Sequence, residues 1–271
     1  MKVGYCVPVT PHMASYRLRV AIPAPLLGCE YEIGCMGKPT FFYKHFEGDR
    51  DLAPAAGPFV YDVVNDHFSG SHAEHYRAMC GAASKVTCSS AAMAETVHRW
   101  TGRDAIVIDD PYENDEQPAE IKGSGVLWFG HLANIKSLWQ TAEKIDGLPI
   151  NLTVCTNLRH DSTVEWSPES ERRCLKDSAL VLVTGDNPGA SANRIVKALR
   201  AGRFVVAPAG TPAWDEWKEH IWIGDVREGV EWALNNREEA CRKVVAGQER
   251  LKEKNHPEAI ARMWMEVFAS I

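Results

Sequence analysis

The sequence contains no run rich in lysine or arginine, and its formal net charge is −6 over 271 residues. Proteins that bind nucleic acid non-specifically usually present a basic face, because contacts to phosphate dominate their affinity. The acidic balance therefore disfavours DNA or RNA as the partner, without excluding a local basic cleft. No stretch approaches the roughly 20 apolar residues of a membrane span, and the N-terminal residues lack the pattern of a secretory signal.

Paired cysteine motifs are absent as well. None of the eight cysteines belongs to a C-x-x-C pair, and most of them lie in apolar segments. A free cysteine behaves as a small hydrophobic residue, and disulfide frameworks are typical of smaller secreted domains. We therefore expect a cytoplasmic protein whose cysteines are reduced, buried thiols. They are Cys6, Cys29, Cys35, Cys80, Cys88, Cys155, Cys174 and Cys241.

What the sequence does contain is a series of short apolar runs that alternate with helical patterns. Strands that alternate with helices predict an α/β fold with parallel sheets covered on both faces. The runs are too numerous for one small sheet, so we expect two. The expected strands are residues 3–7, 32–35, 59–63, 86–88, 105–108, 126–129, 152–155, 180–184, 204–207 and 221–223, and helical spacing occurs at 92–100, 195–201 and 230–234.

An acidic segment, residues 109–125, carries two prolines and no hydrophobic period, so we interpret it as a linker. We accordingly expect an N-terminal domain over residues 1–112 and a C-terminal domain over residues 113–256. Residues 257–271 have the spacing of an amphipathic helix.

One loop and helix could hold an anion. Residues 185–208, GDNPGASANRIVKALRAGRFVVAP, predict a glycine-bearing turn, a helix with Ser191 as its N-cap and Gly202 as its stop, and a strand. Ligands of open parallel sheets bind beyond the carboxyl ends of the strands, where a helix N-terminus favours negative charge. Arg194 could add a bidentate contact to phosphate. The alternative is a plain crossover with a solvated arginine. The loop fits neither G-x-G-x-x-G nor the Walker pattern, which disfavours dehydrogenases and NTPases.

Five stretches resemble, in chain order, those of GT-B glycosyltransferases, particularly the bacterial group 1 branch similar to family 4. Each stretch alone is weakly specific, but the ordered set is fairly specific and spans most of the chain. The stretches are SYRLRVAIPAPLLG (15–28), VYDVVNDHF (60–68), ASKVTCSSAAMAETV (83–97), VLWFGHLANIKSL (126–138) and SANRIVKALRAGRFVVAPAGTPAWDEW (191–217).

The resemblance implies two Rossmann-like domains facing across a cleft, with the helix at 257–271 packing back on the N-terminal domain. It implies metal-independent transfer of a sugar from a UDP- or GDP-sugar to the hydroxyl of a glycan, lipid-linked or other acceptor, in glycan or glycoconjugate synthesis. One alternative is a compact viral-type glycosyltransferase acting on modified bases in DNA. Another is a non-catalytic module that binds nucleotides or glycans.

The resemblance also implies a donor site in the C-terminal domain. Lys136 matches the family's diphosphate-binding lysine, and His131 stands where many members have arginine. Trp166 lies in the region that holds the base, although a packing tryptophan is an equal alternative. The implied donor residues are His131, Lys136, Asn157, Trp166, Gly189, Ser191, Asn193 and Arg194.

The sequence departs from the family at its paired glutamates, the E-x7-E motif. Gly189 and Lys197 occupy the matching positions, and Asp186 is a possible substitute displaced by three residues. Retention and inversion of the sugar configuration therefore both stay open.

Histidines and aspartates gather in NDHFSGSHAEHY, residues 65–76. At a strand end, Asp66 and His67 could act as the base on an acceptor hydroxyl. A metal site and an ordinary polar surface loop are the alternatives. Near the first βα turn we expect Tyr16, Arg17 and Arg19 to line the acceptor side of the cleft, with a solvated first helical turn as the alternative.

Overall fold

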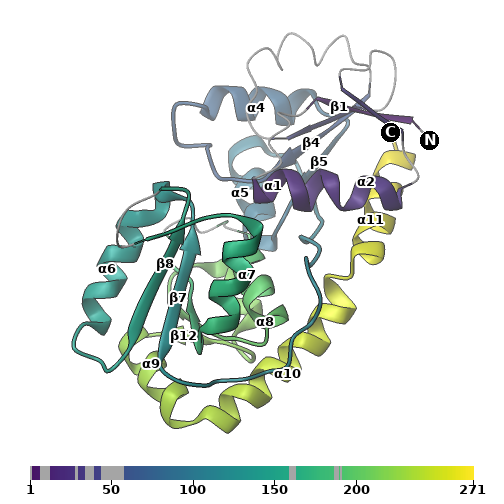
Figure 1. The fold of residues 1–271 in the computed structure, drawn as a ribbon. Coiled ribbons are helices and arrows are strands. Elements are labelled where there is room, and N and C mark those ends of the chain that lie inside the picture. The colour runs from purple at the N-terminus through teal and green to yellow at the C-terminus, as the bar shows by residue number, and fades with distance from the viewer. Residues whose placement is uncertain are drawn as a thin grey trace. The chain divides into compact units, whose positions relative to one another are not determined.

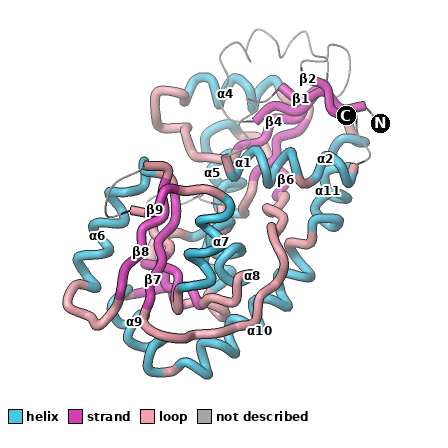
Figure 2. The backbone as a smooth tube through the Cα atoms, in the orientation of Figure 1, coloured by secondary structure: helices cyan, strands magenta, loops and turns pink. Residues whose placement is uncertain are grey.

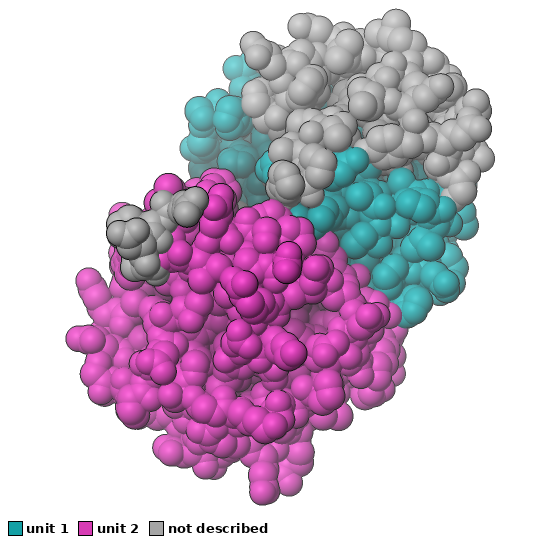
Figure 3. Space-filling model, in the orientation of Figure 1, with its two compact units in different colours: residues 1–111, 187–191, 254–271 teal, residues 112–186, 192–253 magenta. Residues whose placement is uncertain are grey.

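A computed structural model describes residues 2–6, 13–27, 30–33, 40–43, 58–158, 163–185, 189 and 191–271. The chain forms two compact units, coloured separately in Figure 3. The first comprises Met1–Pro111, Asn187–Ser191 and Lys254–Ile271, and the second comprises Tyr112–Asp186 and Ala192–Glu253. Within the described ranges, no helix has both the length and the apolar character required to cross a bilayer.

The first unit is built on a six-stranded sheet in the order β2-β1-β3-β4-β5-β6, in which every neighbouring pair is parallel. The strand β4, FVYDV, is buried at every position, as expected for a parallel strand covered on both faces. The elements are β1 (Lys2–Cys6), α1 (Ala14–Tyr16), a π-helical stretch (Arg17–Ala21), α2 (Pro23–Leu26), β2 (Glu30–Ile33), β3 (Thr40–Tyr43), β4 (Phe59–Val63), α4 (Ala73–Ala82), β5 (Lys85–Cys88), α5 (Ala91–Thr101), β6 (Ala105–Val107) and α11 (Pro257–Ala269).

The C-terminal helix α11 belongs to this first unit and packs beside α2 (Figure 1). Its apolar face carries Ile260, Trp264 and Phe268, which join one core cluster with Val20 of the π-helical stretch. Phe41 of β3 packs edge-on against Trp264, with ring centroids 5.1 Å apart. The last helix of the chain thus contributes to the core formed by the first strands and helices.

The second unit repeats the architecture with the strand order β12-β11-β10-β7-β8-β9, again entirely parallel. Helices α6 and α7 lie on opposite faces of this sheet (Figures 1 and 2). The elements are β7 (Gly125–Gly130), a 3-10 turn (Leu132–Asn134), α6 (Ile135–Ile145), β8 (Asn151–Thr156), β9 (Val164–Glu165), α7 (Pro168–Asp177), β10 (Leu180–Leu182), α8 (Asn193–Arg200), β11 (Phe204–Pro208), a 3-10 helix (Pro212–Trp217), β12 (Trp222–Gly224), α9 (Val226–Asn235) and α10 (Arg237–Lys254).

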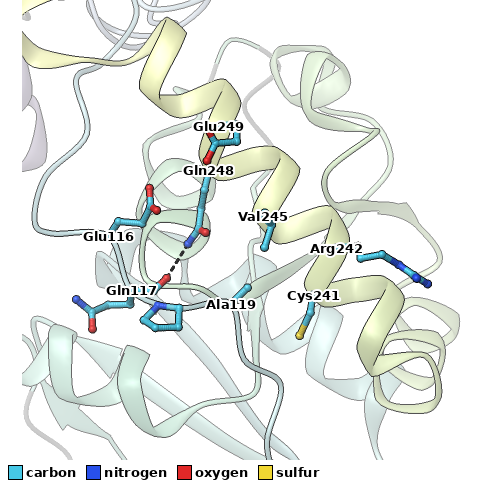
Figure 4. Close-up of a pocket in the computed structure, with 9 residues that line it drawn as sticks. Glu116, Gln117, Ala119, Cys241, Arg242, Val245, Gln248 and Glu249 are labelled. Atoms are coloured by element: carbon cyan, nitrogen blue, oxygen red, sulfur yellow. Dashed lines mark hydrogen bonds between the residues drawn. The ribbon is translucent and has the colours of Figure 1, made fainter.

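The segment that enters the second unit runs along α10 and leaves a cavity of about 640 Å³ beside it (Figure 4). Gln248 of α10 donates to the carbonyl oxygens of Gln117 and Leu199, which fixes this segment against α8. Gly202 follows α8 with φ +74°, the predicted left-handed stop, and a Cβ there would collide with the carbonyl of Pro118. No predicted site residue lines this cavity, so the candidate site lies elsewhere.

The described cysteines agree with the sequence prediction of free thiols. Cys80, Cys88, Cys155 and Cys174 are buried, and Cys241 is partly exposed. Burial raises the pKa of Cys80, Cys88 and Cys155 to about 12, so these thiols stay protonated at neutral pH. The side chains of Cys6, Cys29 and Cys35 lie outside the described part of the chain.

Candidate functional site

A partly buried arginine lies at the carboxyl ends of the central strands of the second unit. Nη2 of Arg194, near the start of α8, donates to the carbonyl oxygen of Thr184 at 2.5 Å. Its Nη1 is shielded from solvent and has no hydrogen-bond partner among the described residues. Burial lowers the pKa of Arg194 to about 10. A desolvated guanidinium without a carboxylate is costly, so this arrangement favours an anionic ligand.

Two glycines lie against this guanidinium. A Cβ at Gly130, the last residue of β7, would lie 3.5 Å from Nη1 of Arg194 and 3.1 Å from the ring of Trp128. A Cβ at Gly185 would lie 3.5 Å from Nη2 and 3.4 Å from the ring of Trp214. Any side chain at either glycine would begin to cover the arginine. The lack of a Cβ at both glycines therefore allows the guanidinium and the two indole rings to pack closely there.

The residue that holds Arg194 is itself fixed. Thr184 accepts the indole N–H of the buried Trp128 at 2.9 Å, and its hydroxyl lies 3.2 Å from that of Ser137 on α6. These contacts join β7, α6 and the end of β10 at one point. The guanidinium is thereby oriented before any ligand arrives, which is the condition for strong electrostatic stabilisation.

Three further predicted residues lie around the loop between β7 and α6: His131 within it, Lys136 in the first turn of α6, and Asn157 directly after β8. Nδ1 of His131 accepts the N–H of Ala133 at 3.1 Å, and Oδ1 of Asn157 accepts the N–H of Leu132 at 2.8 Å. Nδ2 of Asn157 lies 3.3 Å from Nε2 of His131. Lys136, in the first turn of α6, is exposed and makes no ion pair with any residue that the structure describes. His131 and Asn157 thus shape the loop, while Lys136 places an exposed cation in the first turn of α6.

Trp166 follows the edge strand β9 and is tied to a buried ion-pair network. Its indole N–H donates to Oε2 of Glu171 at 2.7 Å. The other oxygen of Glu171 accepts Nζ of Lys197 at 2.7 Å, and Lys197 also pairs with Glu113 at 2.9 Å. Glu171 is 5% exposed and Lys197 is 8% exposed. Lys197, which the sequence resemblance aligns with a glutamate of the E-x7-E motif, is therefore an ion-pair partner of two carboxylates from outside its own helix.

Ser191 does not act as the predicted N-cap. Helix α8 begins at Asn193, its N-cap residue is Ala192, and that residue provides no side-chain cap. The hydroxyl of Ser191 instead donates to the carboxyl group of Asp110, and both residues belong to the first unit. Gly189 also belongs to the first unit, where a Cβ would meet Met93 at 2.5 Å. Asp186 lies outside the described residues.

Comparisons with known proteins give matches among solved structures only. No protein-family model matches the sequence, and no curated protein matches it. HepE from Anabaena, solved in complex with UDP-glucose, superposes with a TM-score of 0.79 over 100% of both chains at 14% identity. WaaG, a glycosyltransferase involved in lipopolysaccharide biosynthesis, gives 0.66 over 97% of this chain and 99% of its own at 12% identity.

A mutant O-GlcNAc transferase from Thermobaculum terrenum gives a TM-score of 0.55, covering 100% of this chain and 67% of its own at 10% identity. The fold is GT-B. The predicted fold class, two Rossmann-like domains, is thereby confirmed, whereas the resemblance to the family 4 branch stays a prediction.

In the first GT-B unit, Asp66 and His67 occupy the loop that leaves the carboxyl end of β4. Oδ1 of Asp66 accepts the N–H of Phe68 at 3.1 Å. This hydrogen bond closes a turn, so the carboxylate stabilises the local backbone. The ring of His67 lies edge-on to Tyr76 and His72, with centroids 5.2 and 5.8 Å away. Within the described residues no group of three or more His, Cys, Asp or Glu side chains is arranged to hold a metal ion.

The prediction that Arg19 lines an acceptor cleft is wrong. Arg19 is 2% exposed, and its Nη2 and Nε donate to the two oxygens of Asp62 at 2.6 and 2.9 Å. Burial alone would lower the pKa of Arg19, but the Asp62 carboxylate raises it above its usual value. Tyr16 and Arg17 remain partly exposed, and Tyr16 packs against the core cluster around Val20. Arg19 is therefore part of a buried ion pair and does not line a cleft.

Two elements of the site were missed from the sequence. The sequence indicated Thr184 only as the end of a strand. In the structure its carbonyl oxygen accepts a hydrogen bond from Arg194, and its hydroxyl accepts one from Trp128 and lies beside that of Ser137. No local sequence pattern indicated a site role for Glu171, because its partners Trp166 and Lys197 lie 5 and 26 positions away. A buried lysine at a motif position that should hold a carboxylate is the signal that could have prompted a search for its counter-ion.

Proposed function

We propose that this protein is a glycosyltransferase that moves a sugar from a nucleoside-diphosphate sugar to an acceptor hydroxyl. The observation that carries the proposal is the Arg194 guanidinium, which is desolvated, oriented by Thr184 and lacks a described partner at Nη1. It lies on a GT-B scaffold similar to HepE, which was crystallised with UDP-glucose, and to the glycosyltransferase WaaG.

In the proposed donor complex the diphosphate contacts Arg194, and Lys136 closes on it from α6. The first turn of α8, with Asn193, adds backbone N–H groups and the positive end of the helix dipole. Cations fixed at the phosphate stabilise the charge that develops on the departing nucleoside diphosphate. The donor is a UDP- or GDP-sugar. Gly130 and Gly185 allow the guanidinium to pack closely there, and His131 and Asn157 hold the loop beside it.

The proposal assigns leaving-group charge to side chains and includes no metal ion. We therefore expect turnover to survive a strong chelator. Ser191 is left out of the donor contacts because its hydroxyl is bound to Asp110. Gly189 stays a proposed member of the donor loop, and Asp66, His67, Tyr16 and Arg17 are the proposed acceptor-side residues.

A panel of nucleotides tests the donor half of the proposal. Saturating UDP or GDP should raise the melting temperature on the order of 5 °C, because a ligand at 100 times its dissociation constant stabilises the folded state by about 2.7 kcal/mol. UMP, GMP and free sugars serve as probes that lack the diphosphate. A panel of UDP, GDP, ADP and their sugars that produces no shift would sink the proposal.

The second candidate is a non-catalytic nucleotide-binding module. It is favoured by Lys197, which the sequence resemblance aligns with a glutamate of the E-x7-E motif and which is bound to Glu171 and Glu113. Both candidates bind the nucleotide, so turnover distinguishes them. Release of nucleoside diphosphate that depends on an added glycan or lipid-linked acceptor establishes the enzyme.

His67→Ala should lower kcat by roughly 10²- to 10⁴-fold, the usual contribution of a general base. The dissociation constant of the nucleotide should change by less than about 2-fold, since His67 lies in the first unit. The matched control is His72→Ala, which removes the neighbouring imidazole 5.8 Å from that of His67. A His67→Ala enzyme with unchanged kcat would assign the base to another residue.

A further inference from the structure

A second buried N–H donor lies near Arg194 in the second unit. Trp214 belongs to the 3-10 helix that follows β11, and its side chain is 1% exposed. Nε1 of its indole ring is shielded from solvent and has no hydrogen-bond partner within the part of the chain that the structure describes. Buried N–H groups in proteins are nearly always paired, because an unmade hydrogen bond costs free energy. The N–H of Trp214 therefore lacks the acceptor that burial normally requires.

Gly185, which follows β10, lies against both Trp214 and Arg194. A Cβ at this position would lie 3.4 Å from Cη2 and 3.5 Å from Cζ2 of the Trp214 ring, and 3.5 Å from Nη2 of Arg194. Cζ2 is joined to the indole nitrogen through a single ring carbon, so the edge of the ring nearest Gly185 is an edge that continues to the N–H. Two side chains whose N–H groups lack described partners, at Nε1 of Trp214 and Nη1 of Arg194, thus meet at the end of one strand.

Trp264 of the first unit shows that an unpartnered indole N–H alone does not make a site. Its Nε1 is also buried without a described partner, but its ring lies in the apolar core of that unit. The charged group over this ring, the Arg19 guanidinium, is bound to both oxygens of Asp62. Beside Trp214, by contrast, no described carboxylate neutralises Arg194, so a bound anion would satisfy the charge and the indole N–H together.

We propose, resting on the proposed function, that the indole N–H of Trp214 donates to the same phosphate group that Arg194 binds, which makes Trp214 a further binding residue of the donor site. A phosphate group has several acceptor oxygens, so one oxygen can pair with Nη1 of Arg194 while another pairs with the indole nitrogen. Solvent reaches neither atom, so a phosphate binds there only when neighbouring side chains move aside, and it is then held away from water. Hydrogen bonds are stronger in such surroundings than in water.

Trp214→Phe tests the proposal, because phenylalanine keeps an aromatic ring and lacks the N–H. Calorimetry of UDP, GDP and inorganic pyrophosphate should show binding weakened by roughly 10- to 150-fold, the range for one lost hydrogen bond to a charged group. The three probes share the phosphate, so their losses should agree within about 2-fold. Losses for UDP and GDP with unchanged pyrophosphate binding would place the contact on the nucleoside and overturn the proposal.

A second variant removes the N–H without changing the size of the ring. A tryptophan analogue in which sulfur replaces the indole N–H, introduced at position 214, should give the same loss of affinity as Trp214→Phe. It keeps the packing of a side chain that is 1% exposed, so a folding defect of the phenylalanine variant does not decide the outcome. Unchanged pyrophosphate affinity with this analogue would overturn the proposal.

Trp264→Phe is the matched control, because it removes the same group and the same volume from the core of the first unit. It should leave all three dissociation constants within about 2-fold of wild type, measured well below the melting temperature of each variant. A loss equal to that of Trp214→Phe would mean that indole removal acts through folding and would overturn the assignment of Trp214. A wild-type protein that binds none of the three probes would instead refute the proposed function.

Discussion

Arg194→Met should strongly weaken donor binding and turnover while making the free protein more stable. The guanidinium is the only described cation fixed at the carboxyl ends of β7 and β10, so kcat/KM should fall by about 10²- to 10³-fold. Methionine is similar in length, and it removes a desolvated charge that no described carboxylate compensates. A substitution that stabilises a protein and destroys its activity is the signature of a functional group held at a cost to folding.

The stability gain has a defined pH dependence. Burial lowers the folded-state pKa of Arg194 to about 10, below its usual value, so the native state disfavours the proton. The free-energy cost of the charged, buried Arg194 in the folded protein is fully present below pH 10, and it is relieved as the pH rises through that value. In urea unfolding at pH 7, the free energy of unfolding of Arg194→Met should therefore exceed that of the wild type by roughly 1–3 kcal/mol. This difference should become smaller above about pH 10.

Arg200→Met provides the matched control on the same helix. Arg200 pairs with Glu116 at 2.6 Å and lies over the ring of Tyr112, so its removal should slightly lower stability and leave nucleotide affinity unchanged. Arg194→Lys should recover only part of the binding, because an ammonium lacks the two-pronged geometry of a guanidinium. Undiminished nucleotide affinity in Arg194→Met would remove the central residue from the proposed donor site.

The strands of both sheets were predictable where burial on two faces produces a continuous apolar run. The runs at 59–63, 126–129 and 204–207 correspond to β4, β7 and β11. Strands β3 and β9 were missed. Strand β9 has only two residues, and it is defined by its pairing with Cys155 and Thr156 of β8 rather than by its own pattern. Such strands depend on a neighbour that local sequence does not specify.

The helix α10 was missed for a different reason. Its buried face includes Gly247 and Gln248, which interrupt the apolar spacing. Gln248 is buried because its side chain donates to two backbone carbonyls, and Gly247 lies where a Cβ would meet Leu199 at 3.0 Å. A polar residue bound to backbone can take a core position, and hydrophobic periodicity does not register it.

The candidate site was predictable in its helix and in the cation near its start, since both follow from local pattern and the strand–helix order. The identity of each partner was not predictable. The hydroxyl of Ser191 could have capped α8, but Asp110, 81 positions away, binds it. Arg17 and Arg19 look alike in sequence, but Arg17 is partly exposed, whereas Arg19 is buried against the carboxylate of Asp62, 43 positions away.

Asp62→Asn should destabilise the first unit by about 3–5 kcal/mol, the usual cost of removing one partner of a buried ion pair. Asp62 is fully buried, receives both prongs of Arg19 and also accepts the hydroxyl of Thr87 at 2.7 Å. The variant leaves Arg19 desolvated without its main counter-ion. Because Arg19 also donates to Ile108 and lies 4.9 Å from the ring centroid of Trp264, the loss should spread to α11.

Chemical denaturation and hydrogen exchange would locate this effect. Protection should fall in β4, β5 and α11, whereas nucleotide binding by the second unit should persist at low denaturant, because the proposed donor residues other than Gly189 belong to that unit. The double variant Arg19→Met with Asp62→Leu should recover most of the lost stability, since apolar side chains of similar volume replace a buried pair at little cost. Full stability in Asp62→Asn alone would show that Asp110 and the Ile108 carbonyl suffice to hold Arg19.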